Sequence, residues 1–209
     1  SRVLSSKLDP ARGFHTTSKT HLLLKLPRQS CSLYLAYTLS PHVFADPYEL
    51  ELHGHAFTLG GKERSRTDLE APVFALNEDA KDVLLLNVHH ALKEREGGKL
   101  EVEVPLHLRY GRPTDASEYA SVDVAPPVAF WACEDGGFSV EITPELTHVA
   151  RGVEGKALYI IEHAPEVGIE TVRVPVGYLG DLRLVEGGTV CVVLVAFMWV
   201  VWKVVGAGR

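Results

Sequence analysis

The sequence lacks the short motifs that mark many enzyme active sites. It contains no GxSxG, HExxH or P-loop pattern. It also contains no Asp-x-Asp pair, the arrangement with which many sugar transferases hold a divalent ion and a phosphate. The residues themselves therefore offer no catalytic site. We expect a protein that is not an enzyme and that has no cofactor of its own.

Basic stretches are also missing. Lysine and arginine together number 21, against 27 aspartates and glutamates, which gives a formal net charge of −6. A protein that binds nucleic acid usually carries a basic patch along one face. No segment of this chain has that composition, so we expect no nucleic-acid partner.

The histidine pairs are the nearest approach to a metal site. His53 and His55 would share one face of a strand, and two more histidines stand together at 89–90. Zinc needs three or four ligands, and the spacing marks no third one. Surface histidines are the better interpretation, so we predict no metal site. A metal-dependent hydrolase built on His53 and His55 is the weakest of the alternatives.

Charge is absent from one long run near the end of the chain. Residues 187–202 carry no charged side chain, and Lys203 then interrupts the run. A helix over 187–206 would be about 30 Å long, which matches the hydrocarbon core of a bilayer. Trp199, Trp202 and Lys203 lie at one end, where aromatic and snorkelling residues meet the headgroups. The valine content would also suit a buried pair of strands, but no turn breaks the run after Gly188.

We therefore predict a transmembrane helix over 187–206, after a connector at 181–186 and before a short cytosolic tail at 207–209. Cations favour the cytosolic side, and the charged residues that follow the run are Lys203 and Arg209, so the preceding residues would face the lumen or the outside. The residues expected in lipid are Val192, Val195, Phe197, Trp199 and Trp202.

The rest of the chain is rich in β patterns. In KLEVEVPLHLRY (99–110) the apolar residues alternate with polar ones, as in a half-buried antiparallel strand. Pro105 lacks an N–H donor, which places this strand at an edge or beside a bulge. We predict a mainly β fold, an antiparallel β-sandwich-like lumenal domain over 19–180, after a polar, loosely held segment at 1–18. The other candidate strands are 21–27, 31–39, 48–53, 82–90, 128–133, 157–163 and 170–177.

Cysteine is scarce, with three residues in the chain. Cys191 falls inside the proposed span, where it cannot pair with a lumenal thiol. Cys31 begins one candidate strand and Cys133 ends another. In an oxidising lumen the two could form a disulfide that closes a loop of about 100 residues. In the cytosol they would instead be reduced and buried. Because we expect a lumenal domain, we favour the disulfide.

Four short clusters together resemble the PIG-X family, the small subunit of glycosylphosphatidylinositol (GPI) mannosyltransferase I. They are GFH (13–15), DPYEL (46–50), HLRYGRP (107–113) and VPVG (174–177), followed by a C-terminal span. The resemblance runs from about residue 13 to the tail, and Cys31 and Cys133 fall where family members carry cysteines. One departure is that the chain has no Asn-x-Ser/Thr glycosylation site, which many relatives carry.

The resemblance implies a single-pass, type I protein of the endoplasmic reticulum membrane with a lumenal β domain. It implies no catalytic role. The partner would be the multispanning PIG-M subunit, which carries the catalytic residues and transfers the first mannose from dolichol-phosphate mannose to the GPI precursor. A type I adhesion or cargo-receptor ectodomain is an alternative with the same topology.

The cluster residues have two interpretations, and the sequence does not separate them. In the structural one, Asp46 and Pro47 set a turn, Tyr48 opens a strand, and Arg109 pairs with a carboxylate such as Glu49. In the other, these residues contact the partner, since tyrosine and arginine are enriched at interfaces. The candidates are Asp46, Pro47, Tyr48, Glu49, His107, Arg109, Tyr110, Arg112 and Pro113.

Overall fold

A computed structural model of the chain describes most of its 209 residues. The described ranges are 1–25, 30–54, 56–60, 68–77, 81–88, 98–134, 153 and 155–207. The chain divides into two compact units. The first comprises 1–112 and 119–175, and the second comprises 113–118 and 176–209.

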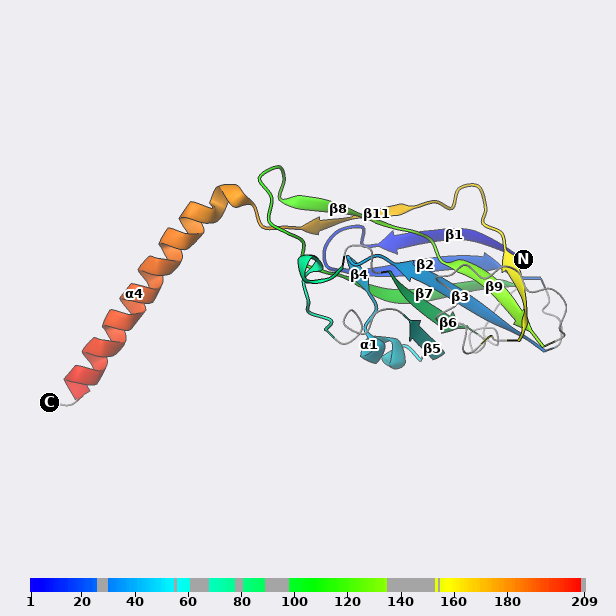
Figure 1. The fold of residues 1–209 in the computed structure, drawn as a ribbon, viewed down its shortest axis with the longest axis horizontal. Helices are drawn as coiled ribbons and strands as arrows, with labels where there is room; N and C mark the ends of the chain where they lie inside the picture. Colours follow the sequence, from blue (N-terminus) through cyan, green and yellow to red (C-terminus); the bar gives the residue numbers. More distant parts are fainter. Residues whose placement is uncertain are drawn as a thin grey trace. The chain divides into compact units, whose positions relative to one another are not determined.

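The first unit is built from antiparallel strands, as predicted (Figure 1). One sheet has the order β1-β2-β7-β4, formed by Arg2–Asp9, His15–Leu23, Lys99–Leu108 and Val43–Phe44. A second has the order β10-β9-β3-β6-β5, formed by Ala157–Ile161, Val128–Cys133, Cys31–Leu39, Asp82–Asn87 and Ala56–Gly60. A third pairs β11 with β8, formed by Glu170–Pro175 and Tyr119–Val124. The described residues of this unit also form two short helices, α1, Pro47–Leu52, and η1, Val73–Ala75.

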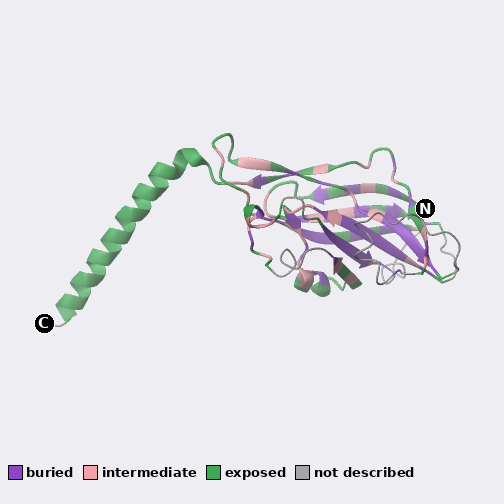
Figure 2. Ribbon diagram, in the orientation of Figure 1, coloured by how far each residue is buried: buried purple, intermediate pink, exposed green. Residues whose placement is uncertain are grey.

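The two larger sheets share one hydrophobic core. Leu22 and Val104 from the first sheet belong to the same buried cluster as Leu35 and Leu84 from the second, and all four are fully buried. Buried residues run along both sheets in Figure 2. Strand β7 shows the alternation that its sequence predicts, with its even-numbered residues buried from Leu100 to Leu108. The β-sandwich prediction is confirmed.

The five-stranded sheet is also buried on its other face. Tyr34 and Phe130 stack there with ring centroids 5.6 Å apart, beside Val83 and Leu85. A strand that is covered on both faces needs apolar residues at consecutive positions. This explains why β3, β6 and β9 read as continuous apolar runs, whereas β7 alternates.

Pro105 lies at a sheet edge, as predicted. Among the described strands, β4 pairs with the outer side of β7 at Leu108 and His107 and not at Pro105. The N–H of Leu108 donates to the carbonyl of Phe14, on the β2 side. Because N–H directions alternate along a strand, the nitrogen of Pro105, which has no hydrogen, faces away from β2. The missing donor therefore costs no hydrogen bond between β2 and β7.

The N-terminal 18 residues differ from the prediction. They form β1 and the first part of β2 and pair with each other and with β7. Several of their inward side chains are hydroxyls: Ser6, Thr16 and Ser18 are less than 10% exposed, and the apolar Val3 and Leu8 are buried beside them. The Ser18 hydroxyl lies 3.2 Å from that of Tyr37, which supplies a hydrogen-bonding partner inside the core. A buried face made partly of serine and threonine gives a weak hydrophobicity pattern, so the sequence of these strands predicted a polar, loosely held segment.

Residues 48–53 were predicted to be a strand, but residues 48–52 belong to α1 and His53 is its C-cap. The Asp46 carboxylate accepts a hydrogen bond from the N–H of Tyr48 at 2.9 Å, and Pro47 occupies the first turn. This capping aspartate and the proline after it satisfy or remove helix-end donors, and Glu49 suits the positive end of the helix dipole. These start signals prevail over the apolar alternation of the segment.

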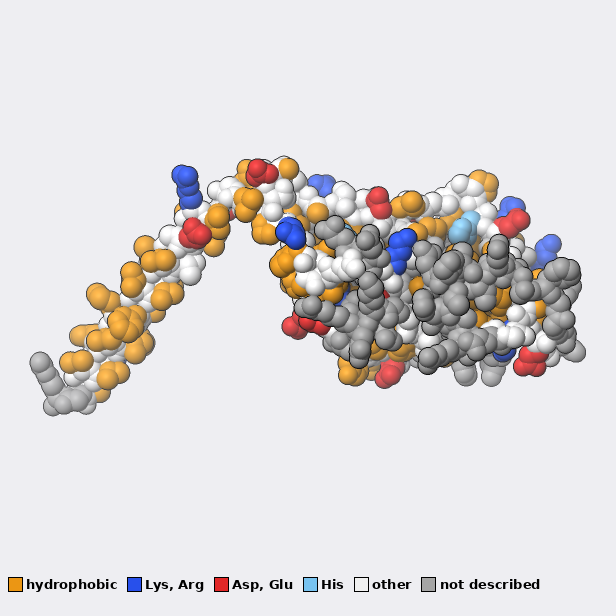
Figure 3. Space-filling model, in the orientation of Figure 1, with side chains coloured by type: hydrophobic (Ala, Val, Ile, Leu, Met, Phe, Trp, Pro, Cys, Tyr) orange, Lys and Arg blue, Asp and Glu red, His pale blue; other side chains and the backbone are white. Residues whose placement is uncertain are grey.

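The second unit contains a long helix, α4, Leu182–Ala207. It begins earlier than the predicted span, so most of the expected connector at 181–186 is helical. Its 26 residues extend for about 39 Å. Apolar side chains cover the visible face of α4 in Figure 3, and its residues are exposed throughout (Figure 2). The alternative of a buried strand pair for the tail is therefore wrong.

Candidate partner-binding site

Three of the four sequence clusters come together around His107. His107 pairs in register with His15 across β7 and β2, and their rings lie 4.7 Å apart, edge to face. The Phe44 ring stacks on His107 at 5.1 Å. The Glu49 carboxylate, from the first turn of α1, lies 2.5 Å from Nε2 of His107. The fold thus joins segments as distant in sequence as His15 and His107 into one cluster.

Arg109 is placed differently from the expected pairing with Glu49. It is 4% exposed, and its Nη1 donates to the carbonyl oxygens of Asp68, Leu69 and Ala71 at 2.9, 2.8 and 3.0 Å. Its guanidinium also lies 4.5 Å from the Phe44 ring centroid. Burial lowers the pKa of Arg109, while Asp82 and Asp68 oppose that shift. The side chain holds the 68–71 segment against the end of β7.

The residues after Arg109 form the exposed part of the cluster. Tyr110 is 63% exposed, its ring lies 4.6 Å from Phe14, and its carbonyl accepts a hydrogen bond from the N–H of Val73. The exposed guanidinium of Arg112 lies 5.4 Å from the Phe74 ring, which is half exposed. Phe14 and Phe74 were not predicted as site residues. The GFH cluster signalled the first, and no local pattern signals the second.

The DPYEL residues divide between support and surface. Asp46 caps α1, Pro47 fills its first turn, and Leu50 is fully buried in the core. Tyr48 is 75% exposed. Aromatic side chains on the surface are typical of protein interfaces. Tyr48 and Tyr110 are therefore the two exposed aromatic residues among the predicted cluster residues.

The fourth cluster, VPVG, begins in β11 and ends in the second unit. Val174 is buried in the β core. In the second unit, the Gly177 carbonyl accepts a hydrogen bond from Thr114, next to Pro113. A Cβ added to Gly177 would lie 3.3 Å from the Pro113 Cβ, closer than most side chains approach. A glycine allows these two segments to meet.

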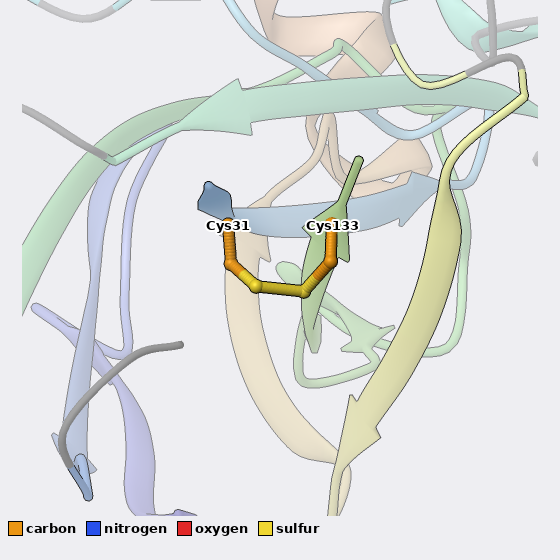
Figure 4. Close-up of a disulfide and its surroundings, with 2 residues drawn as sticks. All are labelled: Cys31 and Cys133. Carbon is orange, nitrogen blue, oxygen red and sulfur yellow. A yellow bond between two sulfur atoms is a disulfide. The ribbon is translucent and has the colours of Figure 1, made fainter. Parts of the chain in front are cut away.

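Cys31 and Cys133 form a disulfide (Figure 4). They lie directly opposite each other in the register of β3 and β9, with Cα atoms 4.1 Å apart and 102 residues apart in sequence. Both are buried. The disulfide prediction is confirmed, and the alternative of two reduced thiols is wrong.

The residues expected in lipid all lie on α4 and are exposed. Among the described residues, α4 with its preceding turn is the one helix long and apolar enough to cross a membrane. This fits a single-pass membrane protein. The Lys203 ammonium lies 5.0 Å from the Trp202 ring, near the C-terminal end. The exposed fractions are 68% for Val192, 70% for Val195, 65% for Phe197, 59% for Trp199 and 67% for Trp202.

The metal hypothesis rests largely on residues outside the described ranges. His53 lies at the exposed C-terminal end of α1, whereas His55 and the histidines at 89–90 are not described. Within the described part of the chain, no group of three or more histidine, cysteine, aspartate or glutamate residues could hold a metal ion.

Comparison with known proteins finds one family and several fungal relatives. The family model described as PIG-X / PBN1 matches residues 11–205. Protein pbn1 of Neurospora crassa is 31% identical over 217 residues, covering 95% of this chain and 42% of the relative. Protein pbn1 of Aspergillus oryzae is 30% identical, covering 85% and 35%, and that of Schizosaccharomyces pombe is 26% identical, covering 91% and 57%. The chain thus spans between about a third and just over half of the length of these relatives. No solved structure matches the chain.

Proposed function

Since the chain belongs to the PIG-X / PBN1 family, we propose that it is a non-catalytic, stabilising subunit of GPI mannosyltransferase I. In this role it supports the transfer of the first mannose from dolichol-phosphate mannose to the GPI precursor by a PIG-M subunit. The observation that carries the proposal is the convergence of three family-like clusters at His107, with Tyr48 and Tyr110 exposed beside it.

The proposed topology is that of a type I protein of the endoplasmic reticulum membrane. The residues up to 186 lie in the lumen, 187–206 cross the bilayer, and 207–209 are cytosolic. The disulfide supports this orientation, because the lumen is oxidising and the cytosol is not. Lys203 near the C-terminal end of α4 supports it as well, through the preference of cations for the cytosolic side.

Two surfaces would hold the partner. In the membrane, α4 is apolar all round, so one of its faces can pack on a helix of the catalytic subunit while the others meet lipid. In the lumen, Tyr48 and Tyr110 would contact loops of that subunit. Aromatic residues of this kind contribute much of the energy at interfaces, while their neighbours contribute little. The catalytic residues would lie on the partner.

The first test is deletion of the gene. Cells without this protein are expected to lose the catalytic subunit, as measured by its steady-state level, and to lose GPI-anchored proteins from their surface. Normal levels of both would contradict the proposal. A detergent pull-down then distinguishes it from an adhesion or cargo-receptor ectodomain, which would bind an external ligand and would not co-purify with a multispanning transferase.

The second test addresses the lumenal surface. The double variant Tyr48→Ala/Tyr110→Ala is expected to fold, because both side chains are largely exposed, and to recover at least about tenfold less of the catalytic subunit in the pull-down. Tyr159→Ala is the matched control, since that tyrosine is 40% exposed but lies in β10 of the five-stranded sheet, whereas Tyr110 follows β7 of the four-stranded sheet. Equal recovery of the catalytic subunit by the double variant and by Tyr159→Ala would show that Tyr48 and Tyr110 do not contribute to the interface.

A further inference from the structure

Two arginines that take no part in the His107 contacts meet at one tyrosine on the outer face of the β8–β11 pair. Tyr119 opens β8 and Arg173 lies in β11, while Arg12 comes from the connection between β1 and β2. Val122, Val172 and Val174 are buried, so by strand alternation Tyr119 and Arg173 point outward. The guanidinium carbons of Arg12 and Arg173 lie 4.4 and 5.1 Å from the centroid of the Tyr119 ring.

Backbone hydrogen bonds hold the two arginines together. The N–H of Gly13 donates to the Arg173 carbonyl at 2.9 Å, and the N–H of Arg173 donates to the Ala11 carbonyl at 3.1 Å. Arg12 and Arg173 therefore form a short parallel bridge. Arg12 also donates from Nη2 to the hydroxyl of Tyr119. The fold thus sets the positions of both backbones, and the Tyr119 ring and hydroxyl contact the guanidiniums.

The charges of this pair are not neutralised within the described part of the chain. Neither Arg12 nor Arg173 forms an ion pair with a described carboxylate, although the chain has 27 acidic residues and a net charge of −6. The nearby carboxylate of Asp123 accepts a hydrogen bond from the Thr171 hydroxyl at 2.7 Å. Two cations at one ring repel each other, and an anion between them would remove the repulsion. The guanidinium fork matches the oxygens of a phosphate.

We propose that Arg12, Arg173 and Tyr119 form a binding site for a phosphate group, supplied by a phosphodiester lipid headgroup. Eight residues of sequence separate Arg173 from Leu182, where the apolar helix α4 begins, so a lipid surface is the source that we test first. Free phosphate has the same chemistry and is the second source. The site is independent of the His107 cluster and does not rest on the proposed function.

The test uses the full chain in an uncharged detergent at low salt, since screening weakens exposed charges. Glycerophosphoinositol, a headgroup phosphodiester without acyl chains, and inorganic phosphate are titrated separately by calorimetry. We expect saturable binding of the phosphodiester. The double variant Arg12→Gln/Arg173→Gln is expected to weaken it at least about tenfold, because hydrogen bonds to charged groups are lost. Lys7→Gln, which removes an exposed cation from β1, is the matched control and is expected to bind as the parent does.

The possible outcomes separate the sources. Tighter binding of inorganic phosphate, with the same loss in the double variant, would support the phosphate site and assign it to free phosphate. No saturable binding of either probe, or equal affinity in the double variant, would overturn the proposal. Circular dichroism checks that the double variant is folded. Should it not fold, Arg173→Lys decides, since it keeps the charge but loses the planar fork and is expected to weaken binding several-fold.

Discussion

Replacement of Arg109 by methionine tests how the end of β7 is held. Arg109 is 4% exposed, and its Nη1 donates to three carbonyl oxygens of the 68–71 segment. Methionine has a similar length and no donor. The variant therefore leaves those carbonyls without their partner while keeping most of the packing against Phe44.

The expected loss of unfolding free energy follows from the number of hydrogens that Nη1 of Arg109 can donate. A guanidinium nitrogen of this kind carries two hydrogens, so the three carbonyls share two charge-assisted hydrogen bonds. Each is worth about 1.5–3 kcal/mol, which sets an upper range of about 3–6 kcal/mol. Part of this is recovered if the 68–71 segment opens and its carbonyls bind water. We expect Arg109→Met to lower the free energy of unfolding by about 2–4 kcal/mol, a large fraction of the stability of an ordinary domain.

Urea unfolding of the full chain in a non-ionic detergent measures the change, with tryptophan fluorescence as the signal. Trp131 is buried in β9, whereas Trp199 and Trp202 lie on α4, so loss of β structure changes the environment of Trp131. The control is the same change at Arg112, which is exposed and makes a longer ring contact. We expect a loss below about 1 kcal/mol there. If Arg109→Met also costs less than about 1 kcal/mol, the buried hydrogen bonds do not support the fold.

Three further predictions concern other parts of the β unit. Replacing Cys31 and Cys133 together by serine is expected to lower the free energy of unfolding by about 4–5 kcal/mol, because the loop that the disulfide closes over 102 residues is released. Urea unfolding of the variant is compared with that of the oxidised parent, and an unchanged midpoint would contradict the prediction. Asp46→Ala is expected to cost about 1 kcal/mol through loss of the α1 cap, with Asp46→Asn as the control that keeps it. Burial raises the pKa of Tyr37, so Tyr37 ionises in the unfolded chain before it does in the folded one, and its contribution to stability, full below about pH 10, falls as the pH rises above that value. The free energy of unfolding is measured at pH 8 and 11, and Tyr37→Phe is expected to lose less of it between these pH values than the parent does. Identical losses in the two proteins would refute the reasoning.

The local sequence predicted the elements whose pattern is contained in consecutive residues. A run without charge predicted α4, because a helix in lipid needs only apolar side chains over a sufficient length. Strict alternation predicted β7, because a half-buried strand exposes every second residue. The disulfide was favoured because Cys31 and Cys133 were expected in an oxidising lumen, whereas Cys191 falls in the apolar run.

Tertiary contacts determine two features that the local sequence pattern predicted wrongly, the first two strands and the burial of Arg109. The first two strands are held by buried hydroxyls such as Ser18, whose partner Tyr37 comes from a distant strand, so their buried face looks polar in sequence. Arg109 looked like a surface cation available for an ion pair. It is buried because the 68–71 segment brings three carbonyls to it, and nothing near it in sequence announces that contact.

By itself, then, the sequence determined that this is a β-rich chain with a long apolar helix and the clusters of its family, and it favoured a disulfide between Cys31 and Cys133. Which cluster residues are buried and support the fold, and which are exposed, was decided by the tertiary structure. His107 and Arg109 are neighbours in one short motif, yet one meets Glu49 near the surface and the other is enclosed by backbone carbonyls. The physical reason is that burial and hydrogen bonding depend on segments brought together from across the chain, and a linear pattern contains only the residues beside it.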